Sequence, residues 1–544
     1  MKHIFLYGPP GSGKSTVGKE LAGLLELPFI DLDLETEKMS GRTTSQLMAE
    51  GESIFRDVES DVLLHVVKEP PSIIALGGGA LLRGENRRCA EDNGAIIFLD
   101  ADLVTLIAHL SNDDIERPLL TGNLETQLGS LLEKRKGHYD SFTTRVYHSG
   151  QFIPQIQKTP KDIACEILRS LNLLHVHTAT GKRYDVKVQP NGLDSLGAWM
   201  QVRELGNPVA VIVDESVADL YADQTIVSLQ RAGYGAHLLT FPAGERSKTI
   251  ETVSQLWDGM IEAGLERRST VVALGGGVTG DLAGFATSAY MRGIRWVGVP
   301  TSLLAMVDSS LGGKTGFDLP QGKNLVGAFH DPELVVVDPI LLDTLSVREK
   351  SAGMAEVIKH GMIGDPELFY IAQQGWEFCA RHLAELISRA ISVKIQIVES
   401  DPYEHGLRAS LNLGHTIGHA VEKASNYTLL HGEAIAIGLV AETILAEEVG
   451  IARSGLTREL IPVLKGFGLP VFAPDDISAE KILQAIKVDK KKVAGAVRFA
   501  LPVDIGKIET GVEIRDLESA LEFCSRGMVM ARIDGRLPSH SKEA

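Results

Sequence analysis

The chain has 544 residues, enough for roughly three or four folding units of ordinary size. Its 54 lysines and arginines against 71 aspartates and glutamates give a net charge of −17, which argues against a general nucleic-acid-binding protein. No apolar run reaches the roughly 18 residues of a membrane span, and the short apolar start lacks the length of a signal peptide. The 4 cysteines lie far apart and form no CxxC pair, so we expect a cytoplasmic protein with reduced thiols.

Apolar and helical stretches alternate over residues 1–172. Short β-rich runs at His3–Tyr7, Pro28–Ile30, Ile73–Leu76 and Ala95–Leu99 are separated by helical patterns, among them Lys14–Leu25 and Lys161–Leu171. This rhythm predicts an α/β domain with a mostly parallel sheet.

A second series of strands begins after residue 178. It comprises Tyr184–Val188, Val209–Val213, His237–Phe241, Val271–Leu274, Ile294–Val299 and Leu334–Val337. After about Asp338 the strand signals end, and stretches such as Leu383–Glu399 and Ala434–Val449 favour helices. We therefore expect a Rossmann-like α/β domain at 178–338, an all-helical metal- and substrate-binding domain at 339–530, and a disordered polar tail at 531–544.

The segment Gly8–Thr16 matches GxxxxGK[ST] between a predicted strand and a predicted helix. Its backbone N–H groups and the helix N-terminus suit phosphate oxygens, Lys14 suits the β- and γ-phosphates, and Ser15 suits Mg²⁺. The predicted ATP and magnesium contacts are Gly11, Ser12, Gly13, Lys14, Ser15 and Thr16.

Charged residues downstream indicate an acceptor pocket. Asp31 and Asp33 follow a predicted strand with one residue between them, so in strand geometry both carboxylates face one cleft. Arg56, Arg117 and Arg135 suit a carboxylate clamp and a lid over the nucleotide.

Residues 1–172 resemble the shikimate kinase family in the phosphate loop, FIDLD, GExxFRxxE, LGGG, RPLL and LxxRxxxY. The resemblance implies that Asp33 orients the acceptor hydroxyl and accepts its proton. It implies that Arg117 closes over the nucleotide and stabilises the transferring charge, and that Asp31 lies near Mg²⁺. It also implies a set of shikimate contacts: Asp33, Arg56, Gly78, Gly79 and Arg135.

The second α/β region contains GxGxxG at Gly275–Gly280, after a predicted strand. The acidic residue that usually follows about 20 positions later is missing, but Asp214 ends an earlier strand and could bind a ribose. Glu245 and Lys248 follow another strand. Dinucleotide binding in a variant arrangement is therefore expected.

The helical region holds candidate metal ligands. His415 and His419 lie four residues apart, hence on one helical face, and Glu356 and His431 lie in similar glycine-rich segments. Two histidines and one carboxylate form a catalytic zinc pattern. Spacing alone leaves open whether His415 pairs with His419 or with His431.

Basic and amide residues are interspersed with glycine, leucine and phenylalanine around these candidates. They indicate a pocket for a small substrate with phosphate and carboxylate groups, and they are Arg292, Lys314, Lys323, Asn324, Lys359, Lys394, Arg408 and Asn412.

Residues 178–510 resemble the 3-dehydroquinate synthase family, in GGGVTGDLAGFAT, VPTSLLAMVDSSLGGKTG, AGMAEVIKHG, NLGHTIGHA and LHGEAIAIG among others. The resemblance implies that Glu356, His415 and His431 hold zinc or cobalt and that His419 faces the substrate, with catalytic roles for Lys314, Lys359 and His419. Arg292 matches a residue lent to a neighbouring subunit, which implies a homodimer through this half.

The same resemblance implies two sets of contacts. The substrate contacts are Arg292, Asp308, Lys314, Asn324, Lys359, Lys394, Arg408, Asn412, His419 and one of Lys490, Lys491 and Lys492, with Lys490 our choice. The NAD contacts are Asp214, Glu245, Lys248, Gly276, Gly277, Val278, Asp281, Thr301, Ser302, Lys314 and Lys323. The implied reaction oxidises a ring hydroxyl beside the metal, eliminates phosphate and returns the hydride, so that NAD ends unchanged.

The chain is thus expected to be a bifunctional shikimate-pathway enzyme of chorismate biosynthesis. It would phosphorylate shikimate with MgATP and convert 3-deoxy-D-arabino-heptulosonate 7-phosphate to 3-dehydroquinate with NAD and a metal. A metal-dependent polyol dehydrogenase is the alternative for the second half, although a neutral polyol needs no cluster of basic residues. A nucleotide-sensing domain is the alternative for the first half, and Lys14, Asp33 and Arg56 argue against it.

Overall fold

The computed structural model describes residues 2–111, 123–150, 155–178, 181–401, 406–490 and 497–514 together with Leu521 and Cys524, with backbone alone for 487–490. It consists of two compact units, residues 1–171 and 172–544. Among the described residues, no helix is long and apolar enough to cross a membrane.

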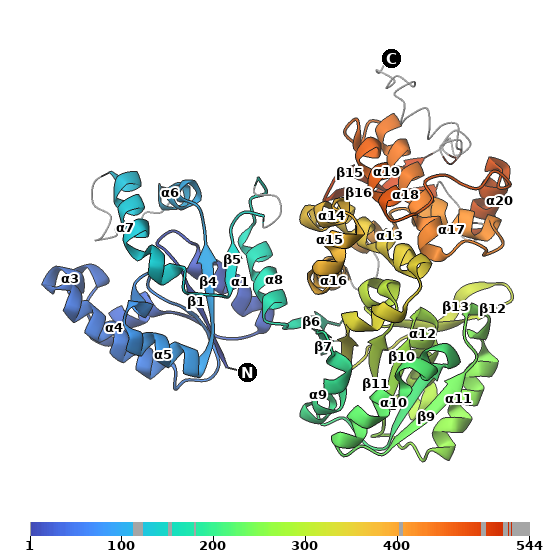
Figure 1. Ribbon diagram of the computed structural model, residues 1–544, viewed down its shortest axis with the longest axis horizontal. Coiled ribbons are helices and arrows are strands. Elements are labelled where there is room, and N and C mark those ends of the chain that lie inside the picture. Colours follow the sequence, from blue (N-terminus) through green and yellow to red (C-terminus); the bar gives the residue numbers. More distant parts are fainter. Residues whose placement is uncertain are drawn as a thin grey trace. The chain divides into compact units, whose positions relative to one another are not determined.

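The first unit is built on a five-stranded parallel sheet in the order β2-β3-β1-β4-β5. The strands are β1 (His3–Tyr7), β2 (Phe29–Asp31), β3 (Ile73–Ala75), β4 (Gly94–Asp100) and β5 (Arg145–Tyr147). Central β1 is buried along its whole length because helices cover both faces of the sheet (Figure 1). These helices are α1 (Lys14–Leu25), α2 (Leu32–Ser40), α3 (Thr44–Glu50), α4 (Glu52–Val66), α5 (Gly84–Asn93), α6 (Leu103–Ser111), α7 (Leu124–Tyr139) and α8 (Pro160–Ser170), with a 3₁₀ turn η1 (Ala80–Leu82).

The second unit begins with a seven-stranded sheet in the order β6-β7-β14-β11-β10-β8-β9, parallel except for edge strand β6. Its strands are β6 (Leu174–His177), β7 (Arg183–Val188), β8 (Val209–Asp214), β9 (Ala236–Phe241), β10 (Thr270–Gly275), β11 (Arg295–Pro300) and β14 (Leu334–Val337). The associated helices are α9 (Leu196–Val202), α10 (Glu215–Arg231), α11 (Ile250–Glu262) and α12 (Gly277–Ala289), with short turns η2 (Gly192–Ser195), η3 (Glu245–Ser247) and η4 (Tyr290–Arg292).

Helices dominate the rest of this unit. They are α13 (Val347–Ile363), α14 (Pro366–Gln373), α15 (Trp376–Arg381), α16 (Leu383–Ser400), α17 (His415–Ala424), α18 (His431–Glu448), α19 (Leu456–Gly466) and α20 (Ala479–Lys490). A π-helical turn η5 (Ala305–Ser309) and 3₁₀ turns η6 (Pro339–Thr344) and η7 (Leu407–Asn412) connect the layers.

The predicted fold class is confirmed, with one correction. The C-terminal part is not all-helical, because β15 (Val497–Asp504) and β16 (Lys507–Ile514) form an antiparallel hairpin. A second hairpin, β12 (Lys314–Leu319) with β13 (Gly322–Phe329), was not predicted either. The predicted boundaries between the later domains, and the tail from residue 531, stay predictions, and the tail lies outside the described residues.

The α17–α18 pair brings two candidate metal ligands together, because His415 and His431 are the first residues of these two helices. The two helices pack at backbone distance, since a Cβ on Gly438 would lie 1.9 Å from the Gly414 carbonyl oxygen. The fully buried Glu442 of α18 also caps α17, accepting from the N–H groups of Gly414 (2.6 Å) and Ile417 (3.0 Å). The helix ends that carry the histidines are therefore fixed by backbone contacts.

We predict that Gly438→Ala destabilises the second unit by about 1–3 kcal/mol, because the added methyl group forces α17 and α18 apart. The control is Gly466→Ala at the end of α19, where nothing lies within 4 Å of the added Cβ. There we expect no loss, or a gain of about 0.5–1 kcal/mol. Urea denaturation followed by circular dichroism measures both, and equal stability of the two variants would contradict the prediction.

Candidate functional sites

The phosphate loop lies between β1 and α1, as its sequence requires. Gly8, Gly11 and Gly13 all have positive φ (155°, 82° and 69°), a backbone region that side chains disfavour. Lys14 Nζ lies within the loop and donates to the carbonyls of Gly8 and Pro9, each at 3.0 Å. The loop is thus a preformed cradle whose lysine points to the place where phosphate oxygens bind.

Two histidines that no motif singled out contact this loop. Near the end of α6, His109 Nδ1–H donates to the Gly11 carbonyl at 2.8 Å, and His148 Nε2–H donates to the Ser12 carbonyl at 2.8 Å. As N–H donors they hold both carbonyls on the outside of the loop, which leaves the N–H groups for the phosphates. An isolated histidine in the last turn of a helix and another after a strand carry no signal for this role.

Asp31 and Asp33 do not share a strand face, so this part of the sequence prediction is wrong. Strand β2 ends at Asp31, whose carboxylate caps α2 by accepting from the N–H groups of Asp33 and Leu34. Ser15 Oγ donates to Asp31 Oδ2 at 2.6 Å, so Asp31 lies beside the residue that is predicted to bind magnesium. Asp33 stands in the first turn of α2, and its Oδ1 would lie 3.0 Å from a Cβ on Gly77.

Two buried arginines line the remainder of this site. Arg56 Nη1 donates to Glu59 Oε2 at 2.6 Å, and a Cβ on Gly79 would lie 2.4 Å from Arg56 Nη2, so only glycine admits the guanidinium there. Arg135 Nη1 donates to the Gly78 carbonyl at 2.8 Å. The segment Gly77–Gly79 after β3 therefore approaches Asp33 and both arginines.

Glu59 is the buried neighbour of this group, and sequence reasoning gave it no role. Burial raises the pKa of its carboxyl to about 7, against the opposing effect of Arg56. It is fully buried beside Asp33, which adds to the pKa shift. The remaining predicted kinase residue, Arg117, lies outside the described residues, as does its RPLL segment.

The carboxyl ends of β8 and β10 form the dinucleotide crevice of the second unit. The chain leaves β8 toward β9 on one side and then continues from β10 toward β11 on the other, so these two strands form a topological switch point. In open α/β sheets ligands bind at such a point. Asp214 caps α10 there and accepts from Thr279 Oγ1 at 3.4 Å, and Gly276 and Gly277 open α12 with its positive N-terminus.

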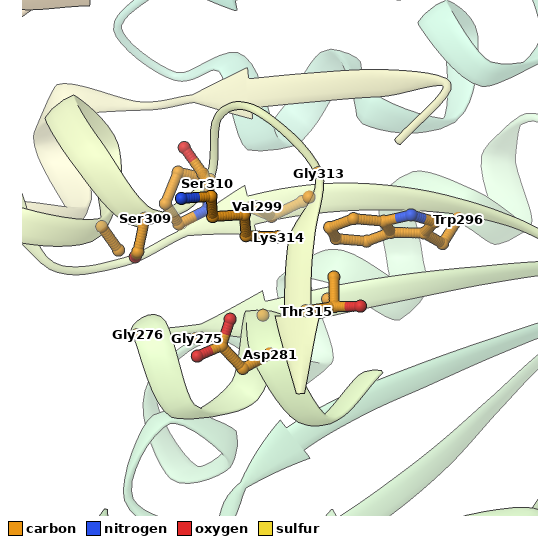
Figure 2. A pocket seen from close by; sticks show the side chains of 15 residues that line it. Gly275, Gly276, Asp281, Trp296, Val299, Ser309, Ser310, Gly313, Lys314 and Thr315 are labelled. Atoms are coloured by element: carbon orange, nitrogen blue, oxygen red, sulfur yellow. The ribbon is translucent and has the colours of Figure 1, made fainter. Parts of the chain in front are cut away.

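Several predicted NAD contacts gather around this crevice. Lys248 pairs with Asp281 at 2.6 Å and also donates to Asn324. A hollow opens beside the glycines, and Figure 2 shows Asp281 and Lys314 among its lining side chains. Thr301 and Ser302 directly follow β11, and Val278 stands in the first turn of α12.

The hollow is also lined by Ser309 and Ser310, which the sequence did not mark. Both hydroxyl oxygens are buried and have no hydrogen-bond partner among the described residues. Because buried polar groups normally find partners, these two hydroxyls are available to a ligand.

Three imidazoles and one carboxylate come together in the helical part. His415, His419 and His431 each place a ring nitrogen within 4.8 Å of the others. The fully buried Glu356 Oε1 lies 3.7 Å from His415 Nε2 and 3.6 Å from His431 Nε2. Glu356 also pairs with Lys359, and its carboxylate and the two imidazole nitrogens converge on one point.

The outer nitrogens of two histidines fix their orientation. His415 Nδ1 lies 3.1 Å from the Leu413 carbonyl, and His431 Nδ1 lies 3.3 Å from Glu422 Oε2. With Nδ1 donating, the Nε2 lone pair is free to bind a metal, which is the usual outer-sphere arrangement of metal-binding histidines. The donor set therefore fits a divalent ion such as zinc.

The charges at this point favour a cation. Burial alone would raise the pKa of Glu356, but Lys359, His431 and His415 bring it well below its usual range. Burial lowers the pKa of His431, but its hydrogen bonds to Glu356 and Glu422 raise it to about 9. The carboxylates of Glu356 and Glu422 thus favour a cation between the imidazoles.

Glu356 and the three histidines His415, His419 and His431 form the candidate metal group, and buried cations surround it. Lys359 is 1% exposed and pairs with Glu356, and Lys394 donates to Asp308 Oδ1 at 2.7 Å. Asp308 sits on the π-helical turn η5, a distortion that is frequent at functional sites. Arg408 is buried, and a Cβ on Gly312 would lie 3.1 Å from its Nη2.

His360 is a further neighbour that sequence reasoning did not assign. It is fully buried, lies within 4.8 Å of Asp308 and Glu356, and neither ring nitrogen has a hydrogen-bond partner among the described residues. Burial and Lys359 lower its pKa to about 3, so it is neutral.

Two other predicted substrate contacts are exposed. Arg292 is exposed on η4, and Asn412 is exposed at the end of η7. The side chain of Lys490, and Lys491 and Lys492 entirely, lie outside the described residues.

Comparison with known proteins shows which families both units match. A family model for shikimate kinase matches residues 10–172, and models for the N-terminal and C-terminal parts of 3-dehydroquinate synthase match residues 238–352 and 353–492. The chain is 45% identical over 334 residues to a 3-dehydroquinate synthase of Synechococcus, covering 60% of this chain and 91% of that protein. A 3-dehydroquinate synthase of Nostoc punctiforme is 44% identical over 338 residues, covering 61% of this chain and 93% of that protein.

Solved structures of two synthases are similar to this chain. A 2-deoxy-scyllo-inosose synthase in complex with carbaglucose-6-phosphate, NAD⁺ and Co²⁺ has a TM-score of 0.59 and 27% identity, covering 64% of this chain and 98% of that one. The 2-epi-5-epi-valiolone synthase of Streptomyces hygroscopicus, with NAD⁺ and Zn²⁺ bound, has a TM-score of 0.57 and 29% identity, covering 65% and 97%.

The fold and the sites define a phosphate-loop kinase unit joined to a synthase unit of the NAD- and metal-dependent type. The chain belongs to the 3-dehydroquinate synthase family and carries a shikimate kinase domain at its N-terminus. The predicted fusion and its predicted cofactors are confirmed at this level.

Proposed function

We propose that the chain catalyses two separate reactions of aromatic biosynthesis. The first unit transfers a phosphoryl group from MgATP to shikimate. The second converts 3-deoxy-D-arabino-heptulosonate 7-phosphate to 3-dehydroquinate with release of phosphate. The observation that carries the second assignment is the buried Glu356 carboxylate facing two oriented imidazoles within a ring of buried cations.

In the kinase unit, MgATP supplies the phosphoryl group when bound. The loop Gly11–Thr16 holds its phosphates, Lys14 leaves the loop carbonyls to contact them, and Ser15 and Asp31 hold Mg²⁺. Arg56 and Arg135 bind the shikimate carboxylate, Gly78 and Gly79 permit its close approach, and Asp33 accepts the hydroxyl proton.

In the synthase unit, bound NAD accepts and returns a hydride, and bound zinc or cobalt polarises the reacting hydroxyl. Glu356, His415 and His431 hold the ion, and the more exposed His419 faces the substrate to move a proton. The anionic substrate is bound by the basic and amide set Lys314, Asn324, Lys359, Lys394, Arg408 and Asn412, with Asp308 holding Lys394 in place. Buried lysines here argue against a neutral polyol as substrate.

We also propose a homodimer formed through the second unit. Met291 and Arg292 both have positive φ (48° and 70°), which costs of order 1–3 kcal/mol each at residues with side chains. Such strain next to an exposed arginine supports a role for Arg292 outside its own subunit, in a partner's site. The 4 free cysteines support a cytoplasmic location.

The first prediction concerns independence of the two reactions. The two motif sets lie in separate units, so Lys14→Met should abolish shikimate phosphorylation and leave the synthase rate within a few-fold. Coupled assays with shikimate and MgATP, and separately with the heptulosonate phosphate, NAD and Zn²⁺, measure both. A parallel loss of synthase activity would show that the units do not act independently.

The second prediction concerns the phosphoryl acceptor. Asp33→Asn keeps the shape of the side chain but removes its charge, so kinase turnover should fall by about 10²–10⁴-fold while ATP affinity changes little. Steady-state kinetics with both substrates test this. Unchanged turnover would exclude Asp33 from proton transfer.

The third prediction separates the histidines. His431→Ala should be purified with little zinc, because a three-residue site loses a ligand. His419→Ala should keep one zinc per chain and turn over slowly. Elemental analysis of both purified variants decides, and zinc lost only from His419→Ala would reverse the assignment.

A further inference from the structure

Lys323 connects two parts of the second unit. It stands near the start of β13, and its Nζ lies 3.1 Å from Glu245 Oε1, which follows β9 in the α/β part. The same Nζ lies 3.1 Å from Glu422 Oε1 on α17 in the helical part, and 4.7 Å from the ring centre of Tyr427. One ammonium group is therefore shared by carboxylates from both parts.

Glu422 divides its two oxygens between two different partners. Oε1 faces Lys323, while Oε2 lies 3.3 Å from His431 Nδ1. Its side chain is only 9% exposed, so the carboxylate depends on these partners for its solvation. The resulting series of contacts runs Glu245, Lys323, Glu422, His431.

The two ends of this series lie at different ligand sites. Glu245 belongs to the loop at the carboxyl end of β9, next to the dinucleotide crevice, and His431 Nε2 converges on Glu356. A metal ion on Nε2 fixes the ring of His431 with its Nδ1–H donating to Glu422, so the position of this carboxylate becomes more restricted. The carboxylate then holds Lys323 more firmly in the position that it takes beside Glu245.

We propose that Lys323 and Glu422 are positioning residues that couple the dinucleotide crevice to the metal group, so that NAD and the metal ion each strengthen binding of the other. The inference rests on the proposed function for both ligands. Such coupling is reciprocal by thermodynamic necessity and typically amounts to a factor of about 5–150 in affinity. An ion pair with one partly exposed partner adds little to overall stability. We therefore assign the Lys323–Glu422 pair a role in coupling the two sites and not in stabilising the fold.

The test measures NAD dissociation constants by calorimetry on the full-length protein, once loaded with one Zn²⁺ per chain and once stripped by a chelator. In the unmodified protein, zinc should tighten NAD binding by at least about 5-fold. In Lys323→Met, and independently in Glu422→Gln, this ratio should fall to about one. Glu422→Gln should also bind zinc about 10–100-fold more weakly, because His431 loses its outer partner.

The matched control is Lys423→Met, which removes an exposed lysine one residue from Glu422 and should keep the zinc effect on NAD. A zinc effect that persists in Lys323→Met would overturn the coupling, as would an unmodified protein that binds NAD equally with and without zinc. An unmodified protein that binds neither NAD nor zinc would overturn the proposed function together with the coupling. Circular dichroism of each variant confirms that it is folded.

Discussion

The second unit depends on compensating the charge of one carboxylate, Glu356, which is fully buried in α13. An uncompensated charge at that depth would cost many kcal/mol. Lys359 stands one helical turn further on, and two imidazoles approach from the first residues of α17 and α18. Those helices are held at backbone distance by glycine, and Glu442 of α18 caps α17, so the packing of the helical part places the ligands.

Most strands of the two main sheets could be predicted, because central strands such as β1, β10 and β14 are buried along their whole length and appear as short apolar runs. The edge strands β5 and β6 were not predicted, since they have only three and four residues. The two hairpins could not be predicted either. Every residue of β13 is at least partly exposed, and its sequence GKNLVGAF includes glycine, lysine and asparagine, which are uncommon in strands, so cross-strand pairing to β12 defines it. Strand β15 follows a long helical series, and nothing local distinguishes it from a buried helical segment.

The chemistry of the sites was visible in the sequence, but the geometry that selects among alternatives was not. The spacing of His415, His419 and His431 allowed two ligand pairs, and the difference lies in partners distant in sequence, Glu356 and Glu422. Asp33 was expected on a strand, yet β2 stops two residues earlier because the Asp31 side chain caps the next helix. His109 and His148 entered no motif, and Ser309 had no assigned role within its motif, since their roles depend on where the fold brings them.

The separation of the motif sets into two compact units on one polypeptide has a consequence for the cell. Every translated chain delivers one kinase site and one synthase site, so their stoichiometry is fixed at synthesis. A change in messenger abundance or in protein turnover alters the amounts of the kinase site and the synthase site in the same proportion. Independent adjustment of the two steps is then left to substrate supply and to inhibition at each site.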